Sequence, residues 1–192
     1  MKILMMLIAF SSGMRILAAQ ELSFRELRSG HDAVYGVRKT MSTPEVVMAR
    51  DDGELGRIWA EDLTGSHRDT TGLPAVNWEA EFVVAIFLGT APSAGYTIRV
   101  QKVVRRGSCI EVTVKERKPA ADDLSAQVLT SPYTVIACPR AGIPLEKVLM
   151  LKLISVDGGV LIERPAWSSI FLVFCLPRTL LCTLLHLYYT SA

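Results

Sequence analysis

The histidines and the paired carboxylates are the side chains in this sequence best suited to catalysis or metal binding. His31, His67 and His186 lie far apart, so no two of them have the local spacing of metal ligands. Asp51-Asp52 and Asp122-Asp123 are adjacent carboxylates, which acid–base catalysis can use. A helix cap explains the first pair, however, and a polar loop explains the second. The sequence therefore predicts no catalytic residue, no metal site and no cofactor, and we expect that the protein is not an enzyme.

Two of the four cysteines, Cys109 and Cys138, lie on predicted strands. In an exported protein they could form a disulfide. They could equally be free, buried thiols, because nothing in the sequence sets their Cα atoms at the roughly 5.5 Å that a disulfide requires. The sequence leaves both alternatives open.

Composition argues against disorder and against nucleic-acid binding. The chain has 192 residues, of which 50% are hydrophobic and 21% charged, and its net charge is only +2. A basic run, Arg99 to Arg106, has Glu111 and Glu116 nearby, which favours a mixed, solvated face over a polyanion site. Residues 20–164 contain 18 of the 21 basic residues and all 19 acidic ones, so their net charge is 18 − 19 = −1.

The N-terminus, residues 1–19, has the pattern of a secretory signal peptide. Lys2 supplies a positive charge, Ile3–Phe10 is a short apolar stretch, and Leu17-Ala18-Ala19 places small residues before Gln20. We therefore expect an exported protein, in the periplasm, in the cell envelope or outside the cell.

The C-terminal tail, residues 165–192, is also hydrophobic. Its segment 168–189 has 22 residues, about 33 Å as a helix, which is enough to cross a hydrocarbon core. Arg178 near the centre and Pro177 beside it both oppose insertion. The tail is either a membrane anchor or a segment that is not native-like sequence, and membrane contact is expected only if 168–189 inserts.

One helix is predicted in the body of the chain. Asp51 is followed three residues later by Glu54, the spacing of an N-terminal capping box. Leu55, Ile58 and Trp59 then fall on one helical face, which predicts about three turns that end near Leu63.

The rest of the body has the pattern of short strands. Phe82–Leu88 is a continuous apolar run, typical of a central strand buried on both faces. Arg106-Gly107-Ser108 and Asp157-Gly158-Gly159 are predicted hairpin turns. The pattern predicts a mainly β fold, an antiparallel β-sandwich or small barrel with one packed helix, in which 20–75 packs on a β domain at 76–164. The other predicted strands are Glu45–Ala49, Tyr96–Gln101, Ile110–Lys115, Gln127–Leu129, Tyr133–Cys138, Val148–Ser155 and Val160–Glu163.

Two loops stand out although neither carries a catalytic group. Gly89–Tyr96 has glycine near each end and a central proline, which makes a shaped turn with an accessible backbone. Thr130-Ser131-Pro132 separates two predicted strands, the second of which begins at Tyr133. Together they are our candidate partner-binding residues: Gly89, Thr90, Pro92, Ser93, Gly95, Tyr96, Thr130, Ser131, Pro132 and Tyr133.

The segments around these loops resemble a known family. Val83-Val84-Ala85-Ile86-Phe87-Leu88-Gly89-Thr90-Ala91-Pro92-Ser93-Ala94-Gly95-Tyr96 is similar to the signature of the protease complex subunit PrcB family. The segment from Val128 to Arg140 resembles the second block of that family. The resemblance covers about residues 76–140 and implies an exported bacterial β domain without catalysis of its own. It further implies a subunit that associates with a secreted protease and stabilises it.

Two other functions remain open. The Pro-x-x-Gly-Tyr turn at Pro92–Tyr96 also resembles the binding loop of chagasin-like cysteine-protease inhibitors, so the same loop could block a protease active site. An envelope protein that has a structural role or binds a ligand in an apolar cavity is the third possibility.

Overall fold

The computed structural model describes residues 19–31, 43–64, 72–120, 122–148 and 150–166. Within them the fold is mainly β, with two sheets and one short helical segment, and the sheets do not close into a barrel. The predicted β-sandwich with one packed helix is confirmed. Residues 1–18 of the predicted signal peptide 1–19, residues 167–192 of the tail and His67 lie outside the described residues, so the corresponding expectations stay predictions.

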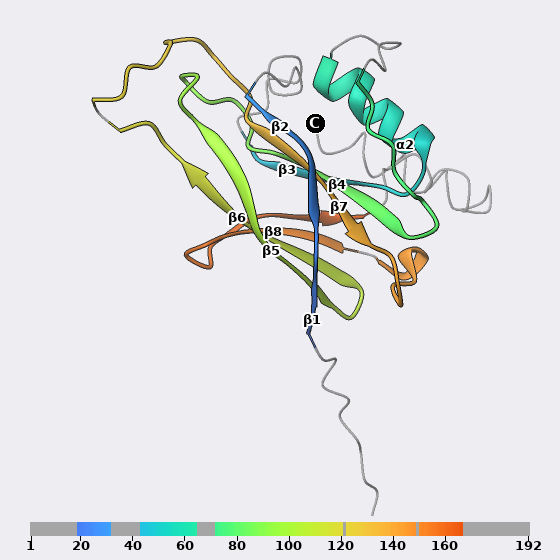
Figure 1. The fold of residues 1–192 in the computed structure, drawn as a ribbon. Helices are drawn as coiled ribbons and strands as arrows, with labels where there is room; N and C mark the ends of the chain where they lie inside the picture. The colour runs from blue at the N-terminus through green and yellow to red at the C-terminus, as the bar shows by residue number, and fades with distance from the viewer. Residues whose placement is uncertain (1–18, 32–42, 65–71, 121, 149, 167–192) are drawn as a thin grey trace, which may run out of the picture.

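The two sheets take strands from both ends of the described chain (Figure 1). The five-stranded sheet has the order β1-β5-β6-β8-β9 and the four-stranded sheet the order β2-β7-β4-β3. The strands are β1 Gln20–Leu22, β2 Arg25–Gly30, β3 Glu45–Ala49, β4 Glu81–Phe87, β5 Thr97–Arg106, β6 Cys109–Arg117, β7 Tyr133–Pro139, β8 Met150–Ser155 and β9 Val160–Pro165. All three strands of segment 20–75 therefore pair with strands of segment 76–164.

Strand pairing departs from the expected all-antiparallel arrangement at one place. β6 and β8 run parallel, from Cys109 opposite Met150 to Val114 opposite Ser155. The connection between them includes β7, which belongs to the other sheet, and the one-turn helix η2, Leu145–Lys147. A long connection of this kind is what a parallel pair requires.

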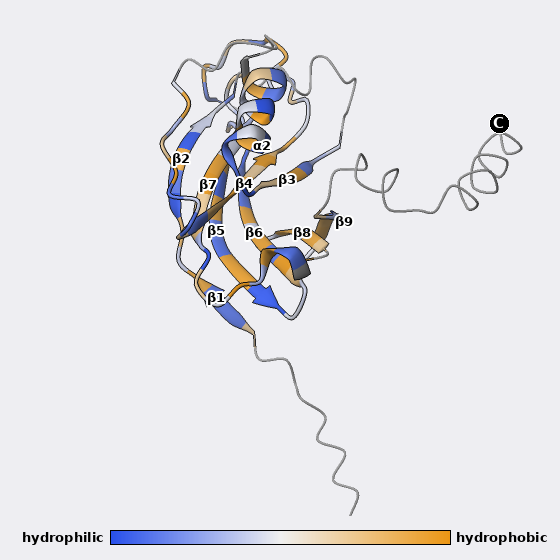
Figure 2. Cartoon of the chain, turned by 90° about the vertical axis from the view of Figure 1, so that its right-hand side faces the viewer, coloured by the Kyte–Doolittle hydropathy of each residue, from blue (hydrophilic) through white to orange (hydrophobic). Residues whose placement is uncertain are grey.

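The continuous apolar run is the centre of the four-stranded sheet, because β4 lies between β7 and β3. Phe82, Val84 and Ile86 point into the core between the two sheets. Val83, Ala85 and Phe87 point to the opposite face, where the helix packs. Both faces of β4 are thus buried, as predicted, and Figure 2 shows the hydrophobic strand residues in the interior.

The helical layer begins at the predicted cap. Asp51 Oδ1 accepts a hydrogen bond from the Glu54 amide at 2.8 Å, and α2 runs from Asp52 to Arg57. The chain continues as the π-helical segment η1, Ile58–Thr64, so the predicted length is right but the second half is more loosely wound. Within the described residues, no helix is long and apolar enough to cross a membrane.

The predicted hairpin turns are both present, but one predicted strand is not. Gly107 and Gly158 adopt positive φ values of 60° and 89° in the β5–β6 and β8–β9 turns, a conformation that glycine reaches without steric cost. Residues 127–129, by contrast, belong to no strand. They lie in the long connection between β6 and β7, where their side chains are exposed.

Candidate protein-binding surface

The two loops singled out in the sequence lie against each other. The amide of Ala91 donates to the carbonyl of Thr130 at 2.8 Å, and the amide of Thr130 donates back to Ala91 at 2.9 Å. The Thr130 hydroxyl donates to the carbonyl of Ser93 at 2.8 Å. The amide of Leu88 also bonds to the carbonyl of Pro132 at 2.9 Å. The structure thus brings the two predicted segments into one unit.

Most of the ten candidate residues serve inside this unit rather than on its surface. Gly89, Ser93 and the whole of Thr130–Tyr133 are buried. Gly95 and Tyr96 are half-buried, and only Thr90 and Pro92 are exposed. Direct contact with a partner is therefore open mainly to Thr90 and Pro92 among the candidates.

Tyr133 is held in the apolar core between the four-stranded sheet and the helical segment. Its hydroxyl accepts a hydrogen bond from Arg28 Nε at 2.8 Å, and its ring lies 6.5 Å from the Phe87 ring. The Arg28 guanidinium in turn stacks over Trp59, with Cζ 4.9 Å from the ring centroid. Tyr133 therefore joins the end of the second loop to the helical layer, which is a structural role.

The exposed part of this region lies on the long connection after β6 and was not predicted from the sequence. Leu124, Val128 and Leu129 have exposed fractions of 104%, 53% and 71%, which is unusual for large apolar side chains that lie close together in sequence. The available signal was the apolar pair Val128-Leu129, but Gln127–Leu129 was predicted to be a strand. A strand would have buried one face, and no partner strand of the described residues lies beside it.

This connection is held against the first loop. The amide of Ala94 donates to the carbonyl of Ala126 at 3.0 Å, and Gly95 packs against Pro119 and Ser125. Figure 1 shows both loops projecting at the same end of the sandwich. We call Thr90, Pro92, Leu124, Val128 and Leu129 the paired-loop surface.

Asp51, Asp123 and His31, which were considered above for catalysis or metal binding, take part in structural hydrogen bonds. In the described residues no three His, Cys, Asp or Glu side chains lie close enough together to hold a metal ion. Asp51 caps the helix, and Asp123 Oδ2 accepts from the amide of Ala120 at 3.0 Å within its loop. The carbonyl of His31 accepts from the amide of Ser131 at 3.0 Å.

Cys109 and Cys138 are free thiols. Cys109 opens β6 in one sheet, whereas Cys138 lies on β7 in the other, within the core between the sheets. Burial raises the pKa of the Cys138 thiol to about 12, with a smaller contribution from Glu81. This thiol is therefore protonated at neutral pH and is a poor nucleophile.

The segment from β4 to β7, with both loops, matches a known family domain. Residues 82–139 match the model of the PrcB C-terminal family. The match runs from β4 to the end of β7 and includes both loops, which confirms the resemblance predicted from the sequence. No curated protein and no solved structure matches the chain. The PrcB C-terminal match thus covers the whole paired-loop unit.

Gly95 is expected to be essential for locking the loops together. A Cβ atom at this position would lie 2.7 Å from Pro119 Cβ, closer than real Cβ contacts allow, and 3.2 Å from Ser125 Cβ. We expect Gly95→Ala to lower the free energy of unfolding by about 1–3 kcal/mol, as other overpacked sites do. Urea denaturation followed by circular dichroism measures this loss.

Gly56 in α2 provides the matched control for Gly95. Nothing lies within 4 Å of a Cβ built there, so Gly56→Ala should be neutral or should stabilise the helix by about 0.5–1 kcal/mol. Equal effects of the two substitutions would contradict a locking role for Gly95.

Proposed function

We propose that the protein is a non-catalytic, exported module that binds a partner protein through the paired-loop surface. The partner that the PrcB C-terminal match suggests is a secreted protease, which the module would stabilise. Export rests on the signal-like pattern of residues 1–19. The protease partner rests on the PrcB resemblance, and the binding surface rests on geometry.

The observation that carries the proposal is the exposure of Leu124, Val128 and Leu129 on a connection that is bonded to a second loop. Backbone hydrogen bonds at Ala91 and Ala94 hold the two loops to each other. Loops held in place in this way lose little further conformational freedom on binding, which leaves more of the interaction energy for affinity. Apolar side chains on a pre-ordered surface are typical of protein–protein contacts.

Serine substitutions on this surface test the proposal directly. We expect the combined variant Leu124→Ser, Val128→Ser, Leu129→Ser to lower affinity for the protease at least a hundredfold. Each lost apolar side chain contributes roughly 1 kcal/mol or more when buried. Affinity is measured by titrating the purified chain against secreted proteases of the native host. The half-life of proteolytic activity is measured in parallel.

The hairpin between β8 and β9 supplies a control with matched chemistry. Val156 and Val160 are exposed to similar extents, 54% and 53%, but lie outside the paired loops. The variant Val156→Ser, Val160→Ser should leave binding and protease half-life unchanged. If the loop variant binds as tightly as the wild type, the surface assignment is wrong.

Turnover distinguishes a stabilising subunit from an inhibitor. A stabilising subunit lengthens the half-life of the protease and leaves its turnover number intact. An inhibitor lowers turnover at stoichiometric concentration. Reduced turnover would therefore favour the inhibitor, and an unchanged half-life would argue against the stabilising role.

A further inference from the structure

We propose that the N-terminal half of β5 accepts an extended, acidic segment of a partner protein as an added β-strand. This inference concerns a different surface from the paired loops and does not depend on the function proposed above. Among the described residues, none bonds to this strand edge, and the edge faces a groove.

The open edge arises because β1 covers only part of β5. β1 pairs with Val103, Val104 and Arg105, and the chain then crosses to the other sheet as β2. In the described ranges, neither a strand nor a loop backbone group bonds to residues 97–101 on the side away from β6. Alternate residues of a strand direct their N–H and C=O groups to each side, so roughly two or three residues there have open backbone groups.

A groove of about 340 Å³ lies in front of this edge, between β5 and β2. Glu26, Ser29 and His31 line it from the β2 side, and Thr97, Arg99 and Gln101 line it from β5. Five residues of edge extend about 16 Å, which suits an extended segment of similar length. The groove therefore has the length and the main-chain groups that strand addition requires.

The shape of β5 changes where the groove ends. Val100 lies opposite Val114 and Lys102 lies opposite Thr113, so Gln101 is an extra residue in β5. Such a bulge bends the strand locally and separates the half covered by β1 from the open half. On the side of the bulge that β1 covers, Lys102 Nζ forms an ion pair with Glu21 Oε2 at 2.8 Å.

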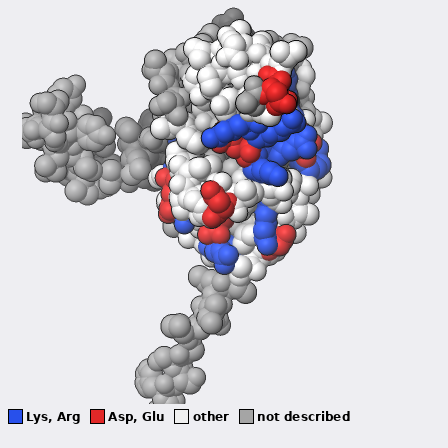
Figure 3. All heavy atoms as spheres, turned by 90° about the vertical axis from the view of Figure 1, so that its left-hand side faces the viewer, with Lys and Arg blue, Asp and Glu red and all other residues white. Residues whose placement is uncertain are grey.

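Charge on the open half identifies the chemistry of the segment. Arg99 and Lys115 are direct cross-strand partners on β5 and β6, and both are exposed. Like charges in this position repel each other, and no acidic group of the described residues pairs with either one. Figure 3 shows several Lys and Arg side chains on one face of the molecule, with Asp and Glu side chains among them. An acidic residue in an added strand, opposite Arg99, would relieve this repulsion. Glu26 lines the β2 side of the same groove and opposes an acidic group there, so the acidic residues of the segment are expected on the side of Arg99.

The inward positions of the edge favour apolar residues in the same segment. Ile98 is buried and Val100 packs against the core between the sheets. A strand beside them would present alternate side chains inward, toward this apolar boundary, and outward, toward Arg99. The expected sequence is therefore alternating apolar and acidic. A second copy of this chain would bring another Arg99–Lys115 pair to the edge, so the charges disfavour self-association there.

A synthetic peptide, Thr-Val-Glu-Val-Glu-Val-Thr, tests the inference with the full-length chain. We expect binding to slow amide hydrogen exchange within residues 97–101 at least tenfold. Arg99→Glu should weaken binding about tenfold, the amount expected when one cross-strand ion pair becomes a repulsive pair. A peptide with Lys in place of Glu should bind the Arg99→Glu variant more tightly than the wild type.

Three controls separate the possible results. Arg57→Glu makes the same change of charge at an exposed position of α2, on the far side of the four-stranded sheet, and should leave binding unchanged. Arg99→Gln gives a milder loss and checks that the reversal has not disturbed folding. The paired-loop serine variant should bind the peptide like the wild type, which keeps this test independent of the function proposed above. Absence of binding, charge-independent binding, protection outside residues 97–101 or dimer formation through this edge would overturn the proposal.

Discussion

Replacement of Trp59 by alanine is expected to lower the free energy of unfolding by about 3–5 kcal/mol, the largest loss that we expect from any single substitution. Trp59, a residue of η1, is only 1% exposed and packs on the face of β4 and β7 that the helical segment covers. Its removal leaves a cavity and also removes the ring over which the Arg28 guanidinium is stacked. Urea denaturation monitored by far-UV circular dichroism measures the loss.

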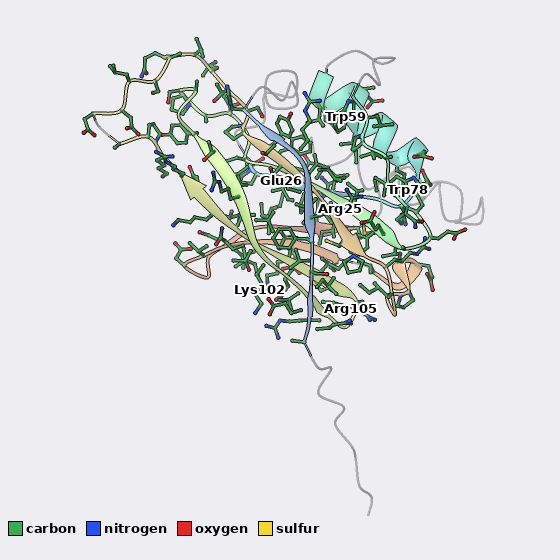
Figure 4. All side chains as sticks on the ribbon, in the orientation of Figure 1. Arg25, Glu26, Trp59, Trp78, Lys102 and Arg105 are labelled. Atoms are coloured by element: carbon green, nitrogen blue, oxygen red, sulfur yellow. The ribbon has the colours of Figure 1, made fainter. Side chains whose placement is uncertain are left out.

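Trp78 is the natural control for Trp59. It is half-buried, and its indole Nε1 donates to Asp52 Oδ1 at 2.7 Å at the start of α2. Figure 4 shows Trp59 on the helical segment and Trp78 near the beginning of α2. Trp78→Ala should cost roughly 1–2 kcal/mol, because less area is buried and water can replace the hydrogen bond. Similar losses for the two variants would show that the helical layer contributes less to stability than its burial indicates.

Stability is expected to fall as the pH rises from about 4.5 to about 7, because of Glu45. Glu45 is 6% exposed at the start of β3, and burial, together with Asp62, raises the pKa of its carboxyl from 4.5 to about 7. The native state therefore holds a proton that the unfolded chain releases in this pH range. At about 1.4 kcal/mol for each pKa unit, the loss attributable to Glu45 reaches about 3 kcal/mol.

Arg164 on β9 contacts Glu45 across the two sheets and favours the charged carboxylate, so 3 kcal/mol is an upper value. Glu45→Gln should flatten the dependence of the unfolding free energy on pH between 4.5 and 7. Denaturant titrations at several pH values measure the difference between the two proteins. Glu79→Gln removes an exposed carboxylate and serves as the control. A wild-type protein that is most stable at pH 7 and a variant with the same slope would contradict this expectation.

Local features of the fold were predictable because they depend on neighbouring residues. Asp51 with Glu54 fixed the helix start, since a capping side chain reaches only two or three residues along the chain. The uninterrupted run in β4 predicted burial on both faces, because alternate side chains of a strand point in opposite directions. Glycine at 107 and 158 marked turns that need positive φ.

The candidate surface was only partly predictable. The two predicted loops lie against each other, but six of their ten candidate residues are buried. Their polarity and turn chemistry fit an exposed loop as well as a loop bonded to its neighbour. Leu124, Val128 and Leu129 are exposed, whereas their apolar type by itself predicts burial. Exposure depends on what packs beside a residue, and that information is not local.

The sequence by itself determined the strand-rich class, the single capped helix, the main turns and the PrcB C-terminal resemblance. Tertiary structure decided which strands pair, including the parallel β6–β8 pair, and how Thr130–Tyr133 lies beneath Gly89–Tyr96. Among the described residues, it also left 97–101 of β5 without a neighbour on one edge. The physical reason is that side-chain periodicity records which face of an element is buried. Pairing and exposure depend instead on contacts between segments far apart in the chain.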